Sequence, residues 1–348
     1  MISFIVPAHN EEFTLPKTLQ AIHDSAHAVD EPYEVIVVND ASTDATAEVA
    51  RKHNAAVLSV NHRQIAATRN SGGRAARGDR LFFVDADTTV TPRAVESALR
   101  WMDNGVAGGG APTRFEGSVP LYARLLLVWL GFFMKIVSIT GGAFMFCTRQ
   151  AFHAVGGFDE RLYGAEDAAM SAALKREGRF VVLNERLFTS GRRVRALSGL
   201  QTLALLARIA FAPSHLTRRS SVEKVWYVST RKGETETTYS LAVRISNGIA
   251  LVILLVLVTL PIWAVPWPRA LLNGPLGALK FGAQIILAHA GLVLWPCSFF
   301  LARNFLQQKR LLDRLKLGVL IAVSLWFACR AALRVCGIWW SLIHWLAN

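Results

Sequence analysis

The amino-acid sequence predicts an α/β fold, a mostly parallel sheet with flanking helices, followed by C-terminal transmembrane helices. Apolar runs alternate with helical repeats over residues 1–103, and strands separated by helices in this way form parallel βαβ units. Hydrophobic residues make up 52% of the 348 residues and charged residues only 18%, which is too apolar for a wholly soluble chain. The apolar excess lies after about residue 244.

Four apolar runs predict strands buried within the sheet. They cover residues 2–6, 35–38, 56–60 and 81–84. Helical spacing of apolar residues, preceded by polar residues that can begin a helix, predicts the intervening helices. These helices are expected from Thr14, from Asp44 to about His53, over 65–77, and from Thr91 to Trp101. Two more strands, at 143–147 and 180–183, and a helix at 168–177 follow.

Residues 104–147 are less regular. The glycine run 108–110 predicts a turn or a close approach of two backbones. The apolar residues 121–133 are too few to span a bilayer, and we expect them to form a buried helix. The alternative is a helix lying at the membrane surface, near a lipid acceptor.

The formal net charge is +13, from 38 Lys and Arg against 25 Asp and Glu. Such a surplus suits nucleic acid, anionic lipid or a phosphate-rich substrate. No nucleic-acid-binding motif is visible, and the positive charge clusters close to the apolar segments. We therefore expect membrane lipids as partners, with charged substrates second and no nucleic acid.

Polar turns follow three of the predicted strands, at residues 7–12, 39–44 and 85–87. Because parallel strands end at one edge of a sheet, these turns should converge on one crevice. Alternation along an extended chain would place Asp85 and Asp87 on the same side, where two carboxylates suit Mg²⁺ or Mn²⁺. The alternative is that Asp87 only caps the turn before the next helix.

Six motifs, taken together, resemble the family 2 glycosyltransferases over about residues 1–195. In chain order they are residues 6–11 (VPAHNE), 38–44 (VNDASTD), 67–72 (ATRNSG), 83–87 (FVDAD), 156–160 (GGFDE) and 166–167 (ED). The resemblance implies a GT-A fold, a nucleotide-diphospho-sugar donor, a divalent metal (Mg²⁺ or Mn²⁺) and an inverting mechanism.

The resemblance also implies roles for the acidic pair Glu166 and Asp167. A hydroxyl acceptor is a poor nucleophile at neutral pH and needs a general base. Asp167 would be that base, with Glu166 orienting the acceptor or the loop. The alternative is that both carboxylates simply favour the N-terminus of a helix, as acidic residues commonly do.

The remaining site residues are assigned to the donor. Asp87 is expected to be the direct metal ligand, because it lies further out of the sheet, and Asp85 is expected to divide its contacts between ribose and metal. Arg69 is expected near the donor phosphates. A solvated helix face is the alternative for Arg69. Asp40 would bind the base or ribose, or cap the following helix. Asn70 is expected to shape the loop. The other nucleotide-sugar-binding candidates are Pro7, Asn10, Glu11, Arg192 and Arg193.

Arg192 and Arg193 would neutralise the leaving diphosphate, or else contact lipid headgroups. The Q-x-x-R-W signature of processive synthases of this family is absent from the sequence. Its absence predicts the addition of one sugar at a time.

The sequence divides into a catalytic domain at 1–195, a basic membrane-proximal linker at 196–243, and a transmembrane region at 244–348. Stretches of 24 and 22 residues without a charged side chain predict spans at about 245–267 and 281–302. A third segment, 317–345, predicts a span or an interfacial helix. Basic residues after the second span place that end, and the catalytic domain, on the cytoplasmic side of a multi-pass protein of the inner membrane.

The sequence therefore predicts an inverting glycosyltransferase that moves a sugar from a nucleotide-diphospho-sugar to a lipid-linked or membrane-proximal acceptor. A nucleotidyltransferase is one alternative, but it would need a glycine-rich basic loop where residues 7–12 are acidic. A non-catalytic membrane scaffold is another, and it would be favoured by loss of a metal-binding or base residue. Asp85, Asp87 and Asp167 are all present.

Overall fold

The computed structural model describes residues 1–211, except 118, 137, 193, 194 and 196, together with residues 242–251 and 254. Described residues up to Ser198 form one compact unit, and α9 (Gly199–Phe211) belongs to a second. The spans predicted at 281–302 and 317–345, most of the span at 245–267 and most of the linker lie outside the described residues. Within the described part of the chain, no helix is both long and apolar enough to cross a membrane.

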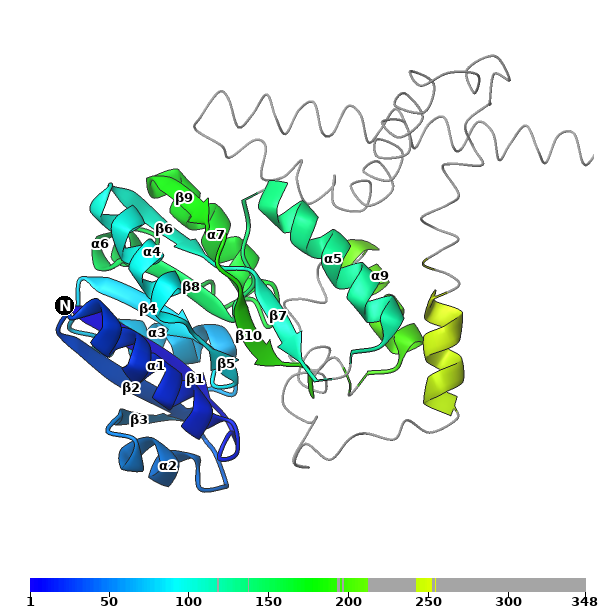
Figure 1. Ribbon diagram of the computed structural model, residues 1–348, viewed down its shortest axis with the longest axis horizontal. Helices are drawn as coiled ribbons and strands as arrows, with labels where there is room; N and C mark the ends of the chain where they lie inside the picture. The colour runs from blue at the N-terminus through cyan, green and yellow to red at the C-terminus, as the bar shows by residue number, and fades with distance from the viewer. Residues whose placement is uncertain are drawn as a thin grey trace, which may run out of the picture. The chain divides into compact units, whose positions relative to one another are not determined.

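A seven-stranded sheet forms the centre of the first unit, in the order β3-β2-β1-β4-β8-β6-β9 (Figure 1). Its strands are β1 (Ile2–Ala8), β2 (Tyr33–Asp40), β3 (Ala56–Val60), β4 (Arg80–Val84), β6 (Val106–Gly110), β8 (Phe144–Thr148) and β9 (Arg179–Val182). Strand β8 runs antiparallel to both of its neighbours, and the other neighbouring pairs are parallel. The mostly parallel sheet that the sequence predicts is confirmed.

A second, three-stranded sheet has the order β5-β10-β7. It consists of β5 (Thr88–Thr89), β10 (Leu187–Ser190) and β7 (Thr113–Glu116). Strand β5 follows the aspartates at 85 and 87 directly, and β10 ends two residues before Arg192. This small sheet therefore brings two distant parts of the candidate site together.

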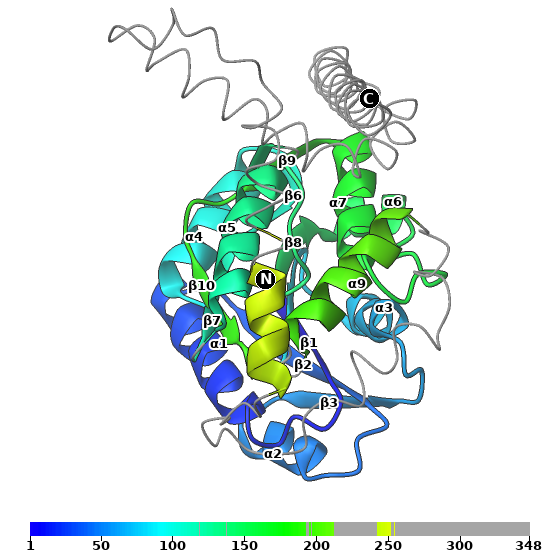
Figure 2. The ribbon, with the colours of Figure 1, turned by 90° about the vertical axis from the view of Figure 1, so that its right-hand side faces the viewer.

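Helices cover both faces of the large sheet (Figure 2). One hydrophobic core lies under α1 (Leu15–Val29), α2 (Thr46–Lys52) and α4 (Pro92–Asp103), and another under α3 (Ile65–Ala75), α6 (Arg149–Ala154) and α7 (Glu166–Glu177). Successive strand residues alternate between the cores, so Phe82 enters the first and Phe83 the second. Burial on both faces explains why the strands read as continuous apolar runs.

The glycine run 108–110 is not a turn, because these residues form the end of strand β6. The expected close approach is confirmed. A Cβ at Gly108 would lie 2.7 Å from the Phe146 carbonyl oxygen, and one at Gly109 would overlap the Val181 carbonyl. The glycines therefore let β6 fit between β8 and β9 in a crowded part of the sheet.

The apolar segment at 121–133 forms α5 (Leu121–Ile136), but the prediction that this helix is buried is wrong for one of its faces. Tyr122 and Ala123 are buried, whereas Leu121 is 56% and Val128 is 70% exposed. Apolar side chains in water are unfavourable, so this face is consistent with the alternative of a helix at a membrane surface.

Candidate active site

The three polar turns meet, as the sequence predicts. Asn10 donates its backbone N–H to Ser42 Oγ at 3.0 Å, and Glu11 donates its backbone N–H to Thr46 Oγ1 at 2.8 Å. These bonds join the turn after β1 to the turn after β2. Thr18 Oγ1, on α1, donates to the Ala86 carbonyl oxygen at 2.9 Å, which fixes the third turn. Pro7, next to this junction, is a buried residue of β1 paired with Val38.

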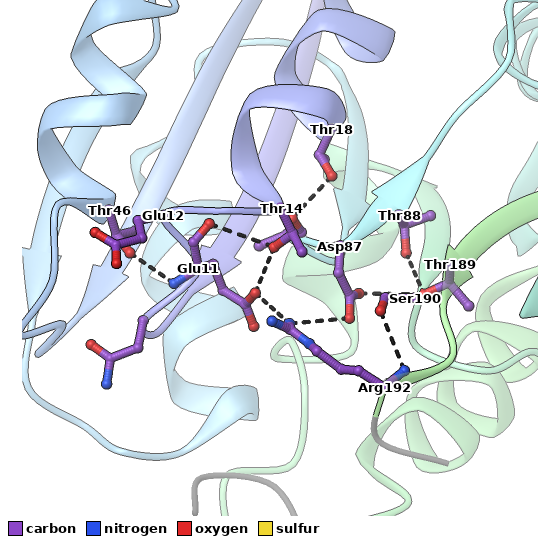
Figure 3. A network of polar contacts seen from close by, with 12 residues as sticks. Glu11, Glu12, Thr14, Thr18, Thr46, Asp87, Thr88, Thr189, Ser190 and Arg192 are labelled. Carbon is purple, nitrogen blue, oxygen red and sulfur yellow. Dashed lines mark hydrogen bonds and ion pairs between the residues drawn. The ribbon is translucent and has the colours of Figure 1, made fainter. Parts of the chain in front are cut away.

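Arg192 lies between two of these turns (Figure 3). Its Nη2 donates to Glu11 Oε2 and lies 3.4 Å from Asp87 Oδ2. Asp87 also accepts a hydrogen bond from Thr189 Oγ1 on β10, at 3.3 Å. The Nε–H of Arg192 is buried and has no acceptor among the described residues. One strong donor is therefore left for an additional anionic group. Arg193 lies outside the described residues.

Arg69 forms a second cluster, on α3, and its side chain is only 3% exposed. Its guanidinium donates to Asp85 Oδ1 at 2.8 Å, to Glu166 Oε1 at 2.7 Å and to the Gly142 carbonyl oxygen at 3.1 Å. Burial alone would lower the pKa of Arg69, but the carboxylates of Asp85 and Glu166 outweigh this effect and hold the pKa above its usual value. The solvated helix face considered for Arg69 is therefore wrong.

The two aspartates of the D-x-D motif have different partners. Strand β4 ends at Val84, and the Thr88 N–H closes a turn onto the Asp85 carbonyl oxygen at 3.0 Å. Alternation along an extended strand therefore does not apply beyond Val84. Asp85 pairs with Arg69, and Asp87 pairs with Arg192. Each carboxylate of the motif is neutralised by its own arginine.

Asp40 is 2% exposed, and both of its carboxylate oxygens accept hydrogen bonds. Oδ1 accepts from the backbone N–H groups of His62 at 2.7 Å and Arg63 at 2.9 Å. Oδ2 accepts from the N–H of Gln64 at 3.2 Å and from Thr68 Oγ1 at 2.9 Å. Asp40 thus orders the loop before α3, whereas the sequence suggested the helix after β2. Its contact with a nucleotide stays a prediction.

Asp167 lies in the first turn of α7, partly buried, next to Glu166. Its pKa is raised to about 7, first because of burial and second because of the neighbouring Glu166 carboxylate. Arg69 and hydrogen bonds from the backbone N–H groups of Ala168 and Gly142 oppose this rise. A carboxyl group with a pKa near neutrality is suited to accept and release a proton at physiological pH.

The backbone just before the acidic pair is strained. Ala165 has φ of +59°, in the left-handed region that alanine adopts at a cost of about 1 kcal/mol or more. Such strain is found preferentially at functional sites, because surrounding structure must hold it in place.

Asn70 holds the loop that leads to α7. Its Oδ1 accepts from the Phe158 N–H at 2.8 Å, and its Nδ2 donates to the Phe158 carbonyl at 2.9 Å and to Glu160 Oε1 at 2.8 Å. A side chain at Gly157 would collide with Asn70. Adjacent residues of α3 therefore anchor the acidic pair through Arg69 and its loop through Asn70.

The donor set fits a divalent cation that takes part of its coordination from the substrate. The described residues contain no group of three His, Cys, Asp or Glu side chains able to hold a metal. Mg²⁺ is commonly held by one or two carboxylates together with substrate phosphates, and Asp85 and Asp87 supply two carboxylates. Asp85 and Asp87 are therefore the residues that would hold a metal bound together with a diphosphate.

A mostly parallel sheet whose strand ends gather a D-x-D turn and a partly buried acidic pair is a GT-A-like α/β fold. Residues 3–153 match the sequence model of Glycosyl transferase family 2. This part of the chain is a family 2 glycosyltransferase domain.

Relatives of known activity match part of the chain. A dolichyl-phosphate beta-glucosyltransferase from Drosophila melanogaster is 34% identical over 180 residues, which are 42% of this chain and 54% of that protein. An undecaprenyl-phosphate 4-deoxy-4-formamido-L-arabinose transferase from Aeromonas hydrophila is 31% identical over 115 residues, 30% of this chain and 35% of that protein. The chain thus spans about half the length of the first relative and about a third of the second.

Two solved structures are similar to the chain. A mannosyltransferase from Pyrobaculum calidifontis, in complex with GDP-Man and Mn²⁺, is 19% identical with a TM-score of 0.45, covering 93% of this chain and 87% of that one. Glucosyl-3-phosphoglycerate synthase from Mycobacterium tuberculosis, in complex with Mn²⁺ and UDP, is 22% identical with a TM-score of 0.42, covering 64% of this chain and 80% of that one.

Proposed function

We propose that this protein transfers a single sugar, with inversion, from a nucleotide-diphospho-sugar to a lipid-linked acceptor at the cytoplasmic face of the inner membrane. One observation carries the proposal: Asp167, with a pKa near neutrality, is connected through Arg69 to the D-x-D turn. A proton acceptor and a donor-binding turn therefore belong to one network. The relatives named for dolichyl-phosphate and undecaprenyl-phosphate support a lipid acceptor.

The donor diphosphate would lie near Asp85, Asp87 and Arg192. A divalent cation held by the two aspartates would supply positive charge next to the phosphates. The buried Nε–H of Arg192 is a donor for one phosphate oxygen, because the described residues offer it no acceptor. Asp40 and Asn10 order the adjoining turns, where the base and ribose would bind.

In the reaction, the acceptor oxygen attacks the anomeric carbon from the face opposite the diphosphate. The bond from carbon to the diphosphate oxygen breaks, and the leaving group takes the electron pair. The proton of an acceptor hydroxyl passes to Asp167, and attack from the opposite face inverts the anomeric centre. Arg192 holds the negative charge that develops on the leaving group.

A second candidate acceptor is the phosphate of a polyprenyl phosphate itself, favoured by the names of the two relatives. A phosphate monoester is already largely ionised at pH 7, so it does not need a general base. The two acceptors therefore differ in their dependence on Asp167, which makes them distinguishable.

The test uses the purified full chain in detergent. It is incubated with a panel of UDP- and GDP-sugars, with Mn²⁺, Mg²⁺ or EDTA, and with a polyprenyl phosphate or a polyprenyl-diphospho-sugar. We expect one sugar nucleotide to release its nucleoside diphosphate in a metal-dependent way, faster with a lipid acceptor, and to give a product with one added sugar. Absence of release from every sugar nucleotide would contradict the proposal.

A further inference from the structure

We propose that Arg69 is a positioning residue that fixes the acceptor side of the site to the donor side. This inference rests on the proposed function, because it assigns Arg69 a part in the same reaction. A single guanidinium contacts Asp85, which follows β4, and Glu166, which begins α7. These two carboxylates lie 81 residues apart in the sequence, and Arg69 bonds to both of them.

The geometry leaves the guanidinium little freedom. Its carbon lies 5.3 Å from the centre of the Phe158 ring, in a cation–π contact. The helix that carries it is also fixed, because a Cβ at Gly72 would overlap Ile5 of β1, and one at Gly73 would lie 2.6 Å from the Phe152 ring. Arg69 is therefore held by its helix on one side and by its ion pairs on the other.

Burial makes the two ion pairs mutually dependent. With the guanidinium 3% exposed, loss of either carboxylate or of the cation leaves an uncompensated charge in a poorly solvated place. A lysine would retain the positive charge, but its single ammonium cannot reproduce the fork of two nitrogens that reaches Glu166 and Asp85 separately.

The Gly142 peptide extends the connection to Asp167. Its carbonyl oxygen accepts from Arg69 at 3.1 Å, and its N–H hydrogen-bonds to the Asp167 carboxylate. A Cβ at Gly142 would lie 2.6 Å from Arg69 Nη2, so glycine is required for this approach. A Cβ at neighbouring Gly141 would lie 4.0 Å from Asp167 Oδ2, so a substitution there would also change the surroundings of this carboxylate.

The charges that act on Asp167 in this network have opposite effects. Glu166 raises its pKa, whereas Arg69 lowers it, together with the N–H groups of Ala168 and Gly142. Removing the arginine should therefore move the protonation of Asp167 to higher pH, and removing the Glu166 charge should move it to lower pH. If Arg69 and Glu166 only stabilised the fold, replacing either of them would leave the midpoint for Asp167 unchanged.

The test measures kcat against pH for sugar transfer by the full chain to a hydroxyl acceptor, the polyprenyl-diphospho-sugar, because only this acceptor needs the base. At low pH, kcat should rise with pH as Asp167 loses its proton, and we call this rise the acidic limb. For Arg69→Met we expect kcat to fall about 100-fold and the midpoint of this limb to move up by about one pH unit. For Glu166→Gln we expect the limb to move down. Arg69→Lys should return the limb to its wild-type midpoint while recovering only part of kcat, because the charge is restored and the fork is not.

Two glycine-to-alanine variants, a test and its control, leave Arg69 itself in place. Gly142→Ala should shift the midpoint upward like Arg69→Met, and Gly131→Ala, whose Cβ meets nothing within 4 Å, should keep the wild-type midpoint. Unchanged midpoints in Arg69→Met, Glu166→Gln and Gly142→Ala, in a wild-type protein that transfers sugar, would overturn the inference. If the wild-type protein transferred no sugar, the proposed function would fail first, so the two failures are distinguishable.

Discussion

Arg69 and Arg192 each form ion pairs with two carboxylates. In both cases one of these carboxylates is an aspartate of the D-x-D motif, Asp85 for Arg69 and Asp87 for Arg192. The D-x-D motif and the acidic pair at 166–167 can be identified from the sequence. The ion pairs with arginine cannot, because Arg192 and Glu11, for example, are 181 residues apart and meet only in the folded protein. Thr189, which contacts Asp87, belongs to no motif, so the sequence does not predict its place in the site.

Asp167→Asn should lower the rate of transfer to a hydroxyl acceptor by about 100-fold or more, because asparagine cannot accept the proton. Donor affinity, measured by calorimetry with the nucleoside diphosphate and Mn²⁺, should remain close to wild type. Transfer that persists with a polyprenyl phosphate, but not with a hydroxyl acceptor, would identify the phosphate as a nucleophile that needs no base.

The same variant should be more stable than wild type at pH 8. The raised pKa of Asp167, about 7, means that the native state holds a proton that the unfolded chain releases from about pH 4 upward. The stability from this group is therefore present at low pH and lost as pH rises to about 7. Chemical denaturation should show a gain of about 1 kcal/mol or more at pH 8 and little at pH 4. A less stable variant at pH 8 would contradict the burial of this carboxylate.

The pH profile of sugar transfer by the wild-type protein tests whether Asp167 is the base. If Asp167 accepts the proton, kcat should rise with pH to a plateau, with a midpoint of about 7, since only the ionised carboxylate is active. Because Asp167 and Glu166 are adjacent, the midpoint belongs to the pair. A rate that does not change between pH 5 and pH 8 would exclude this group as the base.

Arg192→Met should weaken binding of the nucleoside diphosphate by about tenfold, the usual effect of losing a hydrogen bond to a charged group. Lys17→Met offers a matched control. It removes the same charge from an exposed pair, with Lys17 60% exposed and 2.8 Å from Glu116, so nucleotide affinity should not change. An equal effect of both substitutions would indicate a general charge effect rather than a site at Arg192.

At the level of elements, the strands with long apolar runs are predicted from the sequence, whereas the short strands are not. Strand β3 has the bounds that the sequence predicts, and the helices on both faces follow from their apolar spacing. Strands β5, β7 and β10 have two to four residues and carry no apolar run, so periodicity could not find them. These short strands are stabilised by pairing with one another, with β10 hydrogen-bonded to both β5 and β7.

The glycines of β6 and α5 should respond oppositely to the same substitution. Gly109→Ala places a methyl group against the Val181 carbonyl, and we expect a loss of about 1–3 kcal/mol in the free energy of unfolding. Gly131→Ala meets nothing within 4 Å on a helix, and should stabilise by about 1 kcal/mol. Chemical denaturation of both variants measures the difference, and a Gly109→Ala protein as stable as wild type would refute the close approach.

For the whole molecule, net charge and apolar content together predict association with a membrane, and the exposed apolar face of α5 is consistent with this prediction. A reporter fused to the C-terminus tests the expected topology. With three spans, the reporter should lie on the opposite side of the membrane from the glycosyltransferase domain. A reporter on the same side would leave two spans and an interfacial last helix.

The order of strands in the large sheet has a consequence for synthesis of the chain. Strands β1 to β4 find their mutual partners within residues 2–84, so these four strands can pair while the ribosome is still translating the later strands. Strand β8 must then enter between β4 and β6, and β9 joins last beside β6. Until β8 pairs with it, β4 is an unpaired edge strand, and it carries Phe82 and Phe83, which are buried in the folded protein. The nascent polypeptide therefore has its greatest risk of aggregation over about sixty residues, before β8 covers the edge of β4.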